Sequence, residues 1–201
     1  MVLGKSQAEL ENYKPALTNQ SDFDQFWERT LKLIPNEPAV LTALTSPIKT
    51  LDIYDVTIKG FNGDPIKGWF LTPKNLEKPA PLITIFEGYG GGRGEATEWL
   101  FWPSAGYPTL VMDTRGQGSS HRRGETPDGN YPRNNQYPGF MTSGIDDPEN
   151  YYYRRVFTDA VAFTRAGKSL PNVDPDRIVT TGGSQGGGIS LAAARSEEHT
   201  S

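Results

Sequence analysis

A serine set among glycines is the residue of this chain best placed to do chemistry. Residues 182–187 read Gly-Gly-Ser-Gln-Gly-Gly, so Ser184 stands at the centre of a G-x-S-x-G pattern. The run 177–181 before it is rich in β-branched residues and predicts a short buried strand, and the alanine-rich run 188–194 predicts a helix. A serine at a sharp strand-to-helix turn projects its hydroxyl away from the sheet, where it can act as a nucleophile.

The glycines of this stretch are expected to make the turn possible. Side chains at positions 182, 183 and 186 would collide in so tight a bend, and glycine has no Cβ atom. A chance match is one alternative, because 22 of the 201 residues are glycine. A phosphate-binding loop is another, but the segment matches neither G-x-G-x-x-G nor a loop that ends in Gly-Lys-Ser/Thr. The flanking strand and helix favour the nucleophile.

Acyl transfer through a serine also needs donors for the developing oxyanion, and a base that is held by an acid. In this kind of turn the backbone N–H after the nucleophile, here that of Gln185, is one donor. Residues 88–90, Gly-Tyr-Gly, follow an earlier predicted strand and are expected to supply the second donor. The alternative for this segment is a simple tight turn.

The base is the difficulty, because in folds with this turn the acid and the histidine follow the serine. The chain has only two histidines, and His199 lies too close to Ser184 in sequence to come from a separate loop. His121 precedes the serine, so a rearranged order is conceivable, but a solvated loop residue is the simpler interpretation. With two histidines and no cysteine we expect no metal site, and we expect no cofactor.

Three loops are expected to meet around the serine. The apolar runs 82–86 and 109–112 predict strands of a parallel sheet, and 152–167 predicts a helix with an apolar face. Ligands of such sheets bind beyond the carboxyl ends of the strands. The glycine-rich loops at those ends are 87–94, 113–125 and 182–187. In the second loop, Asp113 and Arg115 form a charged pair that can bind substrate or, as we favour, brace the loops.

The N-terminal part predicts an antiparallel opening to this sheet. Residues 50–61 and 66–71 read as two strands, and Asn62-Gly63-Asp64 between them is a strong hairpin signal. A long loop over 119–150 is expected to shape the pocket. Helical patterns cover residues 22–33 and about 95–102.

The composition excludes several classes of partner. Net charge is −4 with acidic and basic residues mixed along the chain, so we expect neither a nucleic-acid nor a membrane partner. No apolar run reaches membrane-spanning length, and the N-terminus lacks the apolar core of a secretion signal. Together with the absence of cysteine, this favours a cytoplasmic protein.

The C-terminal end leaves little room for further strands, because only 17 residues follow Ser184. We therefore expect residues 1–194 to be a partial domain that lacks its last strands. The polar residues 195–201 replace an alanine-rich helix abruptly, and they read like the translation of a common sequencing adapter. They are expected to be a non-native tail.

Two motifs carry a resemblance to a known family: Arg115-Gly116-Gln117 and Gly183-Ser184-Gln185-Gly186-Gly187. Further similar segments are 87–94, 99–104, 137–142 and 151–160. On these residues the chain resembles carbohydrate esterase family 7, the acetyl xylan esterase and cephalosporin C deacetylase group of the α/β-hydrolases. The third motif of that family, a His-Glu pair with the catalytic histidine, is absent.

The resemblance implies an α/β-hydrolase with a doubly wound, mostly parallel sheet and an antiparallel N-terminal hairpin. It implies a serine esterase that removes acetyl groups from small substrates such as acetylated xylo-oligosaccharides and cephalosporin C. Ser184 is then the nucleophile. The oxyanion hole consists of the backbone amides of Tyr89 and Gln185. The first motif, with Arg115 and Gln117, braces the site.

The resemblance further implies a cytoplasmic, cofactor-free enzyme that assembles as a hexamer from dimers. Without a catalytic histidine and acid, the 201 residues alone are expected to be inactive. Two alternatives stay open. One is a serine peptidase of the same fold, and the other is a non-catalytic relative that binds a ligand.

Overall fold

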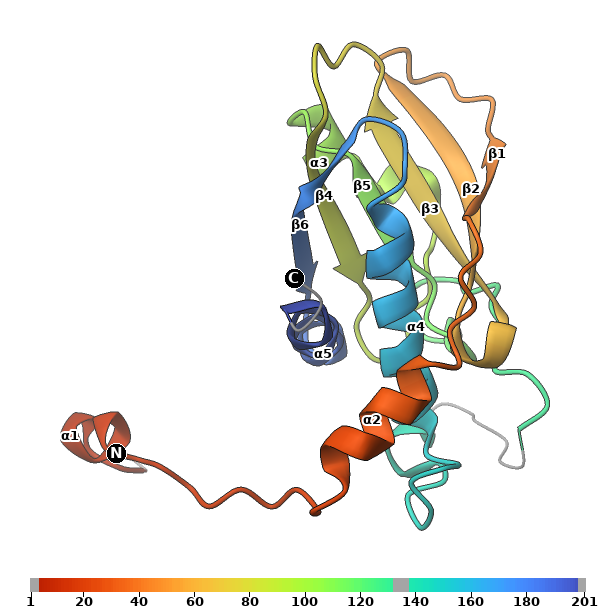
Figure 1. Cartoon of the computed structure of the whole chain (residues 1–201). Coiled ribbons are helices and arrows are strands. Elements are labelled where there is room, and N and C mark those ends of the chain that lie inside the picture. The colour runs from red at the N-terminus through yellow and green to blue at the C-terminus, as the bar shows by residue number, and fades with distance from the viewer. Residues whose placement is uncertain (1–3, 132–137, 199–201) are drawn as a thin grey trace.

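The centre of the protein is a mixed β-sheet with helices on both faces (Figure 1). The computed structural model describes residues 4–131 and 138–198. Within them the sheet has six strands in the order β1-β2-β3-β5-β4-β6. Their bounds are β1 (Val40–Ala43), β2 (Leu51–Lys59), β3 (Pro65–Pro73), β4 (Ala80–Phe86), β5 (Thr109–Met112) and β6 (Val173–Gly182).

The N-terminal side of the sheet is antiparallel and the other side is parallel. β2 and β3 form the predicted hairpin, and β3 also pairs antiparallel with β5. At the hairpin turn, Asn62 and Gly63 have φ angles of 53° and 81°, in the left-handed region that Asn and Gly tolerate. β4 runs parallel to both β5 and β6. The carboxyl ends of these three strands therefore lie together.

One face of the sheet is covered by α4 (Tyr152–Gly167) and α5 (Gln185–Glu198), and α2 (Phe23–Leu31) packs on α4. The predicted helix 152–167 is confirmed at both ends, and its four predicted apolar residues are fully buried. They are Tyr152, Val156, Ala160 and Phe163. Every helix that the structure describes is too short or too polar to cross a lipid bilayer.

The opposite face is covered by two short helical pieces, η2 (Ala96–Trp99) and α3 (Phe101–Ser104). They pack over a second core cluster, which contains Leu51, Ile53, Trp69, Leu71, Ala96 and Val111. The predicted helix over 95–102 is thus divided. Pro103 lacks the amide that a continuous helix would bond back to residue 99, which explains the interruption.

β6 corrects the expectation of a buried strand at 177–181. Within the described residues β6 pairs only with β4, so it forms an edge of the sheet. Val179 is 48% exposed, and residues 175–177 are exposed as well. The β-branched composition predicted the strand itself, but burial depends on neighbouring strands that the local pattern does not specify.

Two elements lie outside the predictions. β1 is a short edge strand, and α1 (Gln7–Glu11) is a single turn of helix whose N-terminus is closed by a capping box between Ser6 and Glu9. No residue of α1 is buried, and the N-terminal segment extends away from the body of the protein (Figure 1). A helix this short depends on its N-terminal cap. It is too short to show the apolar periodicity by which a helix is predicted.

Candidate active site

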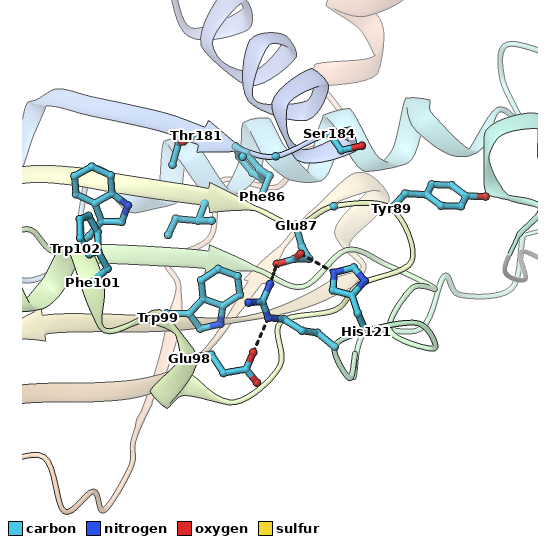
Figure 2. A pocket seen from close by; sticks show the side chains of 15 residues that line it. Phe86, Glu87, Tyr89, Glu98, Trp99, Phe101, Trp102, His121, Thr181 and Ser184 are labelled. Carbon is cyan, nitrogen blue, oxygen red and sulfur yellow. Dashed lines mark hydrogen bonds and ion pairs between the residues drawn. The ribbon is translucent and has the colours of Figure 1, made fainter.

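Ser184 lies in the turn between β6 and α5. β6 ends at Gly182 and α5 begins at Gln185, so the chain reverses sharply there. Ser184 has a φ of 53°, a left-handed conformation that costs a non-glycine residue about 1–3 kcal/mol and is found mainly at functional sites. Ser184 is exposed, and its hydroxyl projects beyond the end of the strand (Figure 2). The predicted turn is present, and the nucleophilic role remains a prediction.

Two of the three predicted glycine contacts are found. A Cβ atom on Gly186 would lie 2.1 Å from the carbonyl oxygen of Phe86, and one on Gly182 would lie 2.5 Å from the backbone of Gly186. Both glycines therefore allow β4 to approach the turn. The expected collision at Gly183 is wrong, because a Cβ atom there would meet nothing within 4 Å. That position is exposed rather than enclosed.

The Gly186→Ala substitution tests this packing. It is expected to lower the free energy of unfolding by about 1–3 kcal/mol, because the new methyl group must displace β4. Gly188→Ala is the matched control in the same helix: a Cβ atom there meets nothing within 4 Å, and alanine favours helix by up to about 1 kcal/mol. Urea unfolding followed by circular dichroism measures both. Equal effects of the two substitutions would contradict the close approach of Phe86.

The loop after β4 lies against the serine turn. A Cβ atom on Gly88 would be 3.7 Å from the carbonyl oxygen of Gly183. The amide of Gly91 donates to the carbonyl of Gly88 at 3.1 Å, so residues 88–91 form a tight turn. The backbone of Tyr89 is inside that turn, and the amide of Gln185 is the first of α5. Both expected oxyanion donors thus belong to adjoining turns, and their role stays a prediction.

Gln117 joins these two turns. Its Oε1 accepts a hydrogen bond from the Gly90 amide at 2.6 Å, and its Nε2 donates to Gln185 Oε1 at 2.9 Å. Nε2 also lies 2.9 Å from the hydroxyl of Tyr152, which donates to the carbonyl of Arg115. Gln117 is only 5% exposed. The side chain thus connects the loop after β4 with the start of α5, and the bracing role expected of it remains a prediction.

Tyr153 is a site residue that the sequence did not reveal. Its hydroxyl donates to Gln185 Oε1 at 2.7 Å, so Gln185 is held from two sides. Burial raises the pKa of both Tyr152 and Tyr153, which keeps the two hydroxyls protonated as donors. Apolar periodicity predicted that Tyr152 is in the core. The same pattern gives no information about hydrogen bonds of the Tyr153 hydroxyl.

Arg115 binds carboxylates of three other segments, and the site-bracing role expected of it remains a prediction. It is fully buried, and its Nε and a terminal nitrogen bind the two oxygens of Asp159 at 2.6 and 2.8 Å. It also forms ion pairs with Asp64 at 2.9 Å and Asp128 at 3.5 Å. Burial alone lowers the pKa of Arg115, but the charges of these carboxylates outweigh it and hold that pKa above its ordinary value.

Asp113 corrects the expected pair with Arg115. Its carboxylate accepts hydrogen bonds from the amides of Arg93, Glu125 and Thr126, at 2.7 to 2.8 Å. Burial raises the pKa of Asp113, and these amide donors oppose that rise. The two residues therefore brace the loops through different partners. The sequence distance of two positions does not place their side chains together, because the strand has ended.

A cavity of about 690 Å³ opens beside Ser184. Figure 2 shows its walls, which come from the end of β4, the turn after β6, η2, α3 and residues 121–122. Its lining combines aromatic and charged side chains: Phe86, Tyr89, Trp99, Phe101 and Trp102, and Glu87, Glu98, His121 and Arg122. Ser184 is among the residues that line the cavity.

His121 is exposed, as expected of a solvated loop residue, but its ring also has defined partners. Its Nε2 lies 3.0 Å from Glu87 Oε1, and its Nδ1 lies 3.4 Å from the hydroxyl of Ser120. The ring therefore faces Glu87 rather than Ser184, as Figure 2 shows. The rearranged triad would need a different ring position. Among the described residues, no three histidine or carboxylate side chains are grouped to hold a metal ion.

The long loop 119–150 is fastened to the site by Tyr89. The Tyr89 hydroxyl donates to the carbonyl of Pro138 at 2.7 Å and accepts a hydrogen bond from the amide of Phe140 at 3.1 Å. Phe140 begins η3 (Phe140–Thr142) and is buried. Residues 138–142 of the family-like segment 137–142 therefore lie beside Tyr89, and Tyr137 lies outside the described residues.

Comparison with known proteins identifies this arrangement. A family model described as acetyl xylan esterase (AXE1) matches residues 2–201. The chain is 29% identical over 192 residues to the acetyl esterase Axe7A of Xylanibacter ruminicola, and this match covers 92% of the chain and 42% of the relative.

Two solved structures share the fold. The acetyl xylan esterase from Paenibacillus sp. R4 is 42% identical, with a TM-score of 0.82, over 94% of this chain and 60% of that one. Acetyl xylan esterase 1 from Thermoanaerobacterium sp. JW/SL YS485 is 29% identical, with a TM-score of 0.83, over 96% of this chain and 60% of that one. The chain thus has the α/β-hydrolase fold and spans about 60% of these structures. Because the family model matches nearly the whole chain, the chain belongs to the acetyl xylan esterase family.

Proposed function

We propose that this chain is the N-terminal part of a serine esterase that removes acetyl groups from small substrates, such as acetylated xylo-oligosaccharides and cephalosporin C. One observation carries the proposal: Ser184 stands exposed in a strained turn, beside the 88–91 turn and a cavity of about 690 Å³. Relatives named as acetyl esterases support acetyl esters as the substrates.

In the proposed reaction, Ser184 Oγ attacks the acetyl carbonyl and the alcohol leaves with a proton. Water then attacks the acyl-enzyme, which releases acetate and restores the hydroxyl. The amides of Tyr89 and Gln185 are proposed to stabilise the oxyanion in both steps. The loss of one such donor costs about 3–4 kcal/mol of transition-state stabilisation, so the hydrogen bonds of Gln117 that hold both turns bear directly on the rate.

The base and the acid are proposed to come from a C-terminal part that this chain does not contain. His121 cannot serve in its present position, because its ring faces Glu87. We therefore propose that this chain is a partial domain, since it spans about 60% of the two solved structures that it matches. This chain together with that C-terminal part is called the full-length protein.

Acetate release tests the proposal. The full-length protein is expected to hydrolyse p-nitrophenyl acetate and acetylated xylo-oligosaccharides, whereas residues 1–201 alone are expected to show no turnover, because neither a base nor its acid is positioned at Ser184. Cleavage of peptides in place of acetyl esters by the full-length protein would favour a peptidase. Ligand binding with no hydrolysis of any ester would favour a non-catalytic relative.

We also propose a cytoplasmic location and a hexamer assembled from dimers for the full-length protein. The lack of cysteine supports the first, and the family resemblance supports both. Light scattering on the purified full-length protein measures its assembly, and a monomer at working concentration would contradict the second.

A further inference from the structure

The cavity beside Ser184 is lined by aromatic rings and by charged groups. Figure 2 shows Phe101 and Trp102 together at one end of it, whereas Trp99 lies beside Glu98 among the charged groups. The charged groups are Glu87, Glu98, His121 and Arg122, which we call the charged cluster. Charged groups in the lining attract or repel any substrate that carries a charge.

Glu87 is the fixed centre of the charged cluster. It follows β4 directly and is 7% exposed. Its Oε1 lies 3.0 Å from His121 Nε2, and its Oε2 accepts a hydrogen bond from Arg122 at 2.8 Å. A buried carboxylate is costly unless it is paired, so these contacts keep the charge in one place. Glu87 lies two residues before Tyr89, whose amide is a proposed oxyanion donor.

A single guanidinium serves two carboxylates in this cluster. Arg122 binds Glu98 at 2.5 Å as well as Glu87, and it stacks over the Trp99 ring at 4.5 Å from the centroid. The acidic partners raise the pKa of Arg122 although burial opposes that rise. When His121 is neutral, the charged side chains lining this cavity in the described part of the chain carry one negative charge in excess.

The loop of the charged cluster also has backbone attachments. Backbone hydrogen bonds already join residues 118–123 to residues 90–94. They run from the amide of Gly118 to the Gly90 carbonyl, from Ser120 to Gly90, from Gly92 to Arg122, and from Gly94 to Arg123, at 2.9 to 3.2 Å. The loop that carries His121 and Arg122 is thus attached through its backbone as well as through the charged cluster.

We propose that the charged cluster makes the cavity select esters by charge: it disfavours acetyl esters with an anionic alcohol part and favours neutral or cationic ones. The inference rests on the proposed function, because it places the ester in this cavity beside Ser184. A charge in a partly enclosed cavity acts over several ångströms, since the low-dielectric walls screen it poorly. Neutral acetylated oligosaccharides are then preferred to cephalosporin C, which carries carboxylates.

Matched aryl acetates test the selection on the full-length protein. The substrates are meta-acetoxybenzoate, which is anionic, its neutral methyl ester, and the cationic meta-acetoxy-trimethylanilinium, and release of the phenol is followed at mildly alkaline pH. For the wild-type protein, kcat/KM is expected to be lower for the anionic ester than for the neutral ester. Added salt is expected to reduce that difference, because it screens exposed charges.

Two variants of opposite sign distinguish charge from architecture. Glu87→Gln is expected to raise the anion-to-neutral ratio of kcat/KM about three- to tenfold, and Arg122→Gln is expected to lower it by a similar factor, because each changes one unit of charge at the cavity. Glu77→Gln makes the same charge change at an exposed residue between β3 and β4, and it is expected to leave the ratio unchanged.

Each outcome is decisive. If the full-length protein does not hydrolyse the neutral ester, the proposed function fails. If it does, and the ratio is the same in wild type, Glu87→Gln and Arg122→Gln, or shifts in the same direction in both variants, charge selection is wrong although the esterase proposal stands. The neutral ester also reports whether each variant retains a folded site.

Discussion

Ser184→Ala is expected to reduce acetyl ester hydrolysis by the full-length protein by a factor of about ten thousand to a million. The proposed mechanism passes through a covalent acyl-enzyme on this oxygen, and no neighbouring hydroxyl occupies the same turn. The oxyanion donors and the cavity remain in the variant, so substrate binding is expected to persist. The measurement is kcat for p-nitrophenyl acetate, with an active-site titration to exclude traces of wild-type enzyme.

Ser190→Ala is the matched control for this substitution. Ser190 lies on α5, the helix that follows the serine turn, and its hydroxyl donates to Thr180 at 2.9 Å, away from the cavity. Its removal is expected to change kcat by no more than a few fold. If Ser184→Ala retained wild-type turnover, the nucleophile would be another group and the proposed function of the serine turn would be wrong.

Local patterns predicted the parts of this protein that neighbouring residues determine. The β2–β3 hairpin follows from Asn62-Gly63, whose backbone adopts the required left-handed angles. α4 follows from a single apolar face, and the serine turn follows from a strand, a glycine-rich bend and a helix in succession. Each of these signals is contained in fewer than about twenty residues, which is the range over which periodicity is informative.

Contacts between segments that are distant in sequence could not be predicted from local patterns. Gln117 and Gln185 are 68 positions apart, and Glu87 and His121 are 34 apart. Only the fold brings such pairs together, so the sequence indicated that loops 87–94, 113–125 and 182–187 converge but not which side chains meet. The family resemblance supplied the bracing role of Gln117, whereas nothing supplied Tyr153 or the pairing of His121.

Asp159→Ala is expected to lower the free energy of unfolding by about 3–5 kcal/mol, because it leaves the buried guanidinium of Arg115 without its main partner. Asp159 is fully buried, and it binds Arg115 at 2.6 and 2.8 Å and the Phe61 amide at 2.8 Å. Urea unfolding measures the change. Asp174→Ala removes a half-buried carboxylate whose partner Arg177 is exposed, and it is expected to have little effect.

The double variant Arg115→Met, Asp159→Ala separates the cost of an unpaired charge from the cost of lost packing. If the unpaired guanidinium dominates, the double variant is expected to be more stable than Asp159→Ala alone, because methionine removes the buried charge and keeps most of the side-chain volume. If the changes in unfolding free energy of Arg115→Met and Asp159→Ala simply add in the double variant, the two side chains do not stabilise the fold through their ion pair. Because Arg115 is two residues from Gln117, the Asp159→Ala variant is also expected to loosen the loop that joins the two proposed oxyanion turns.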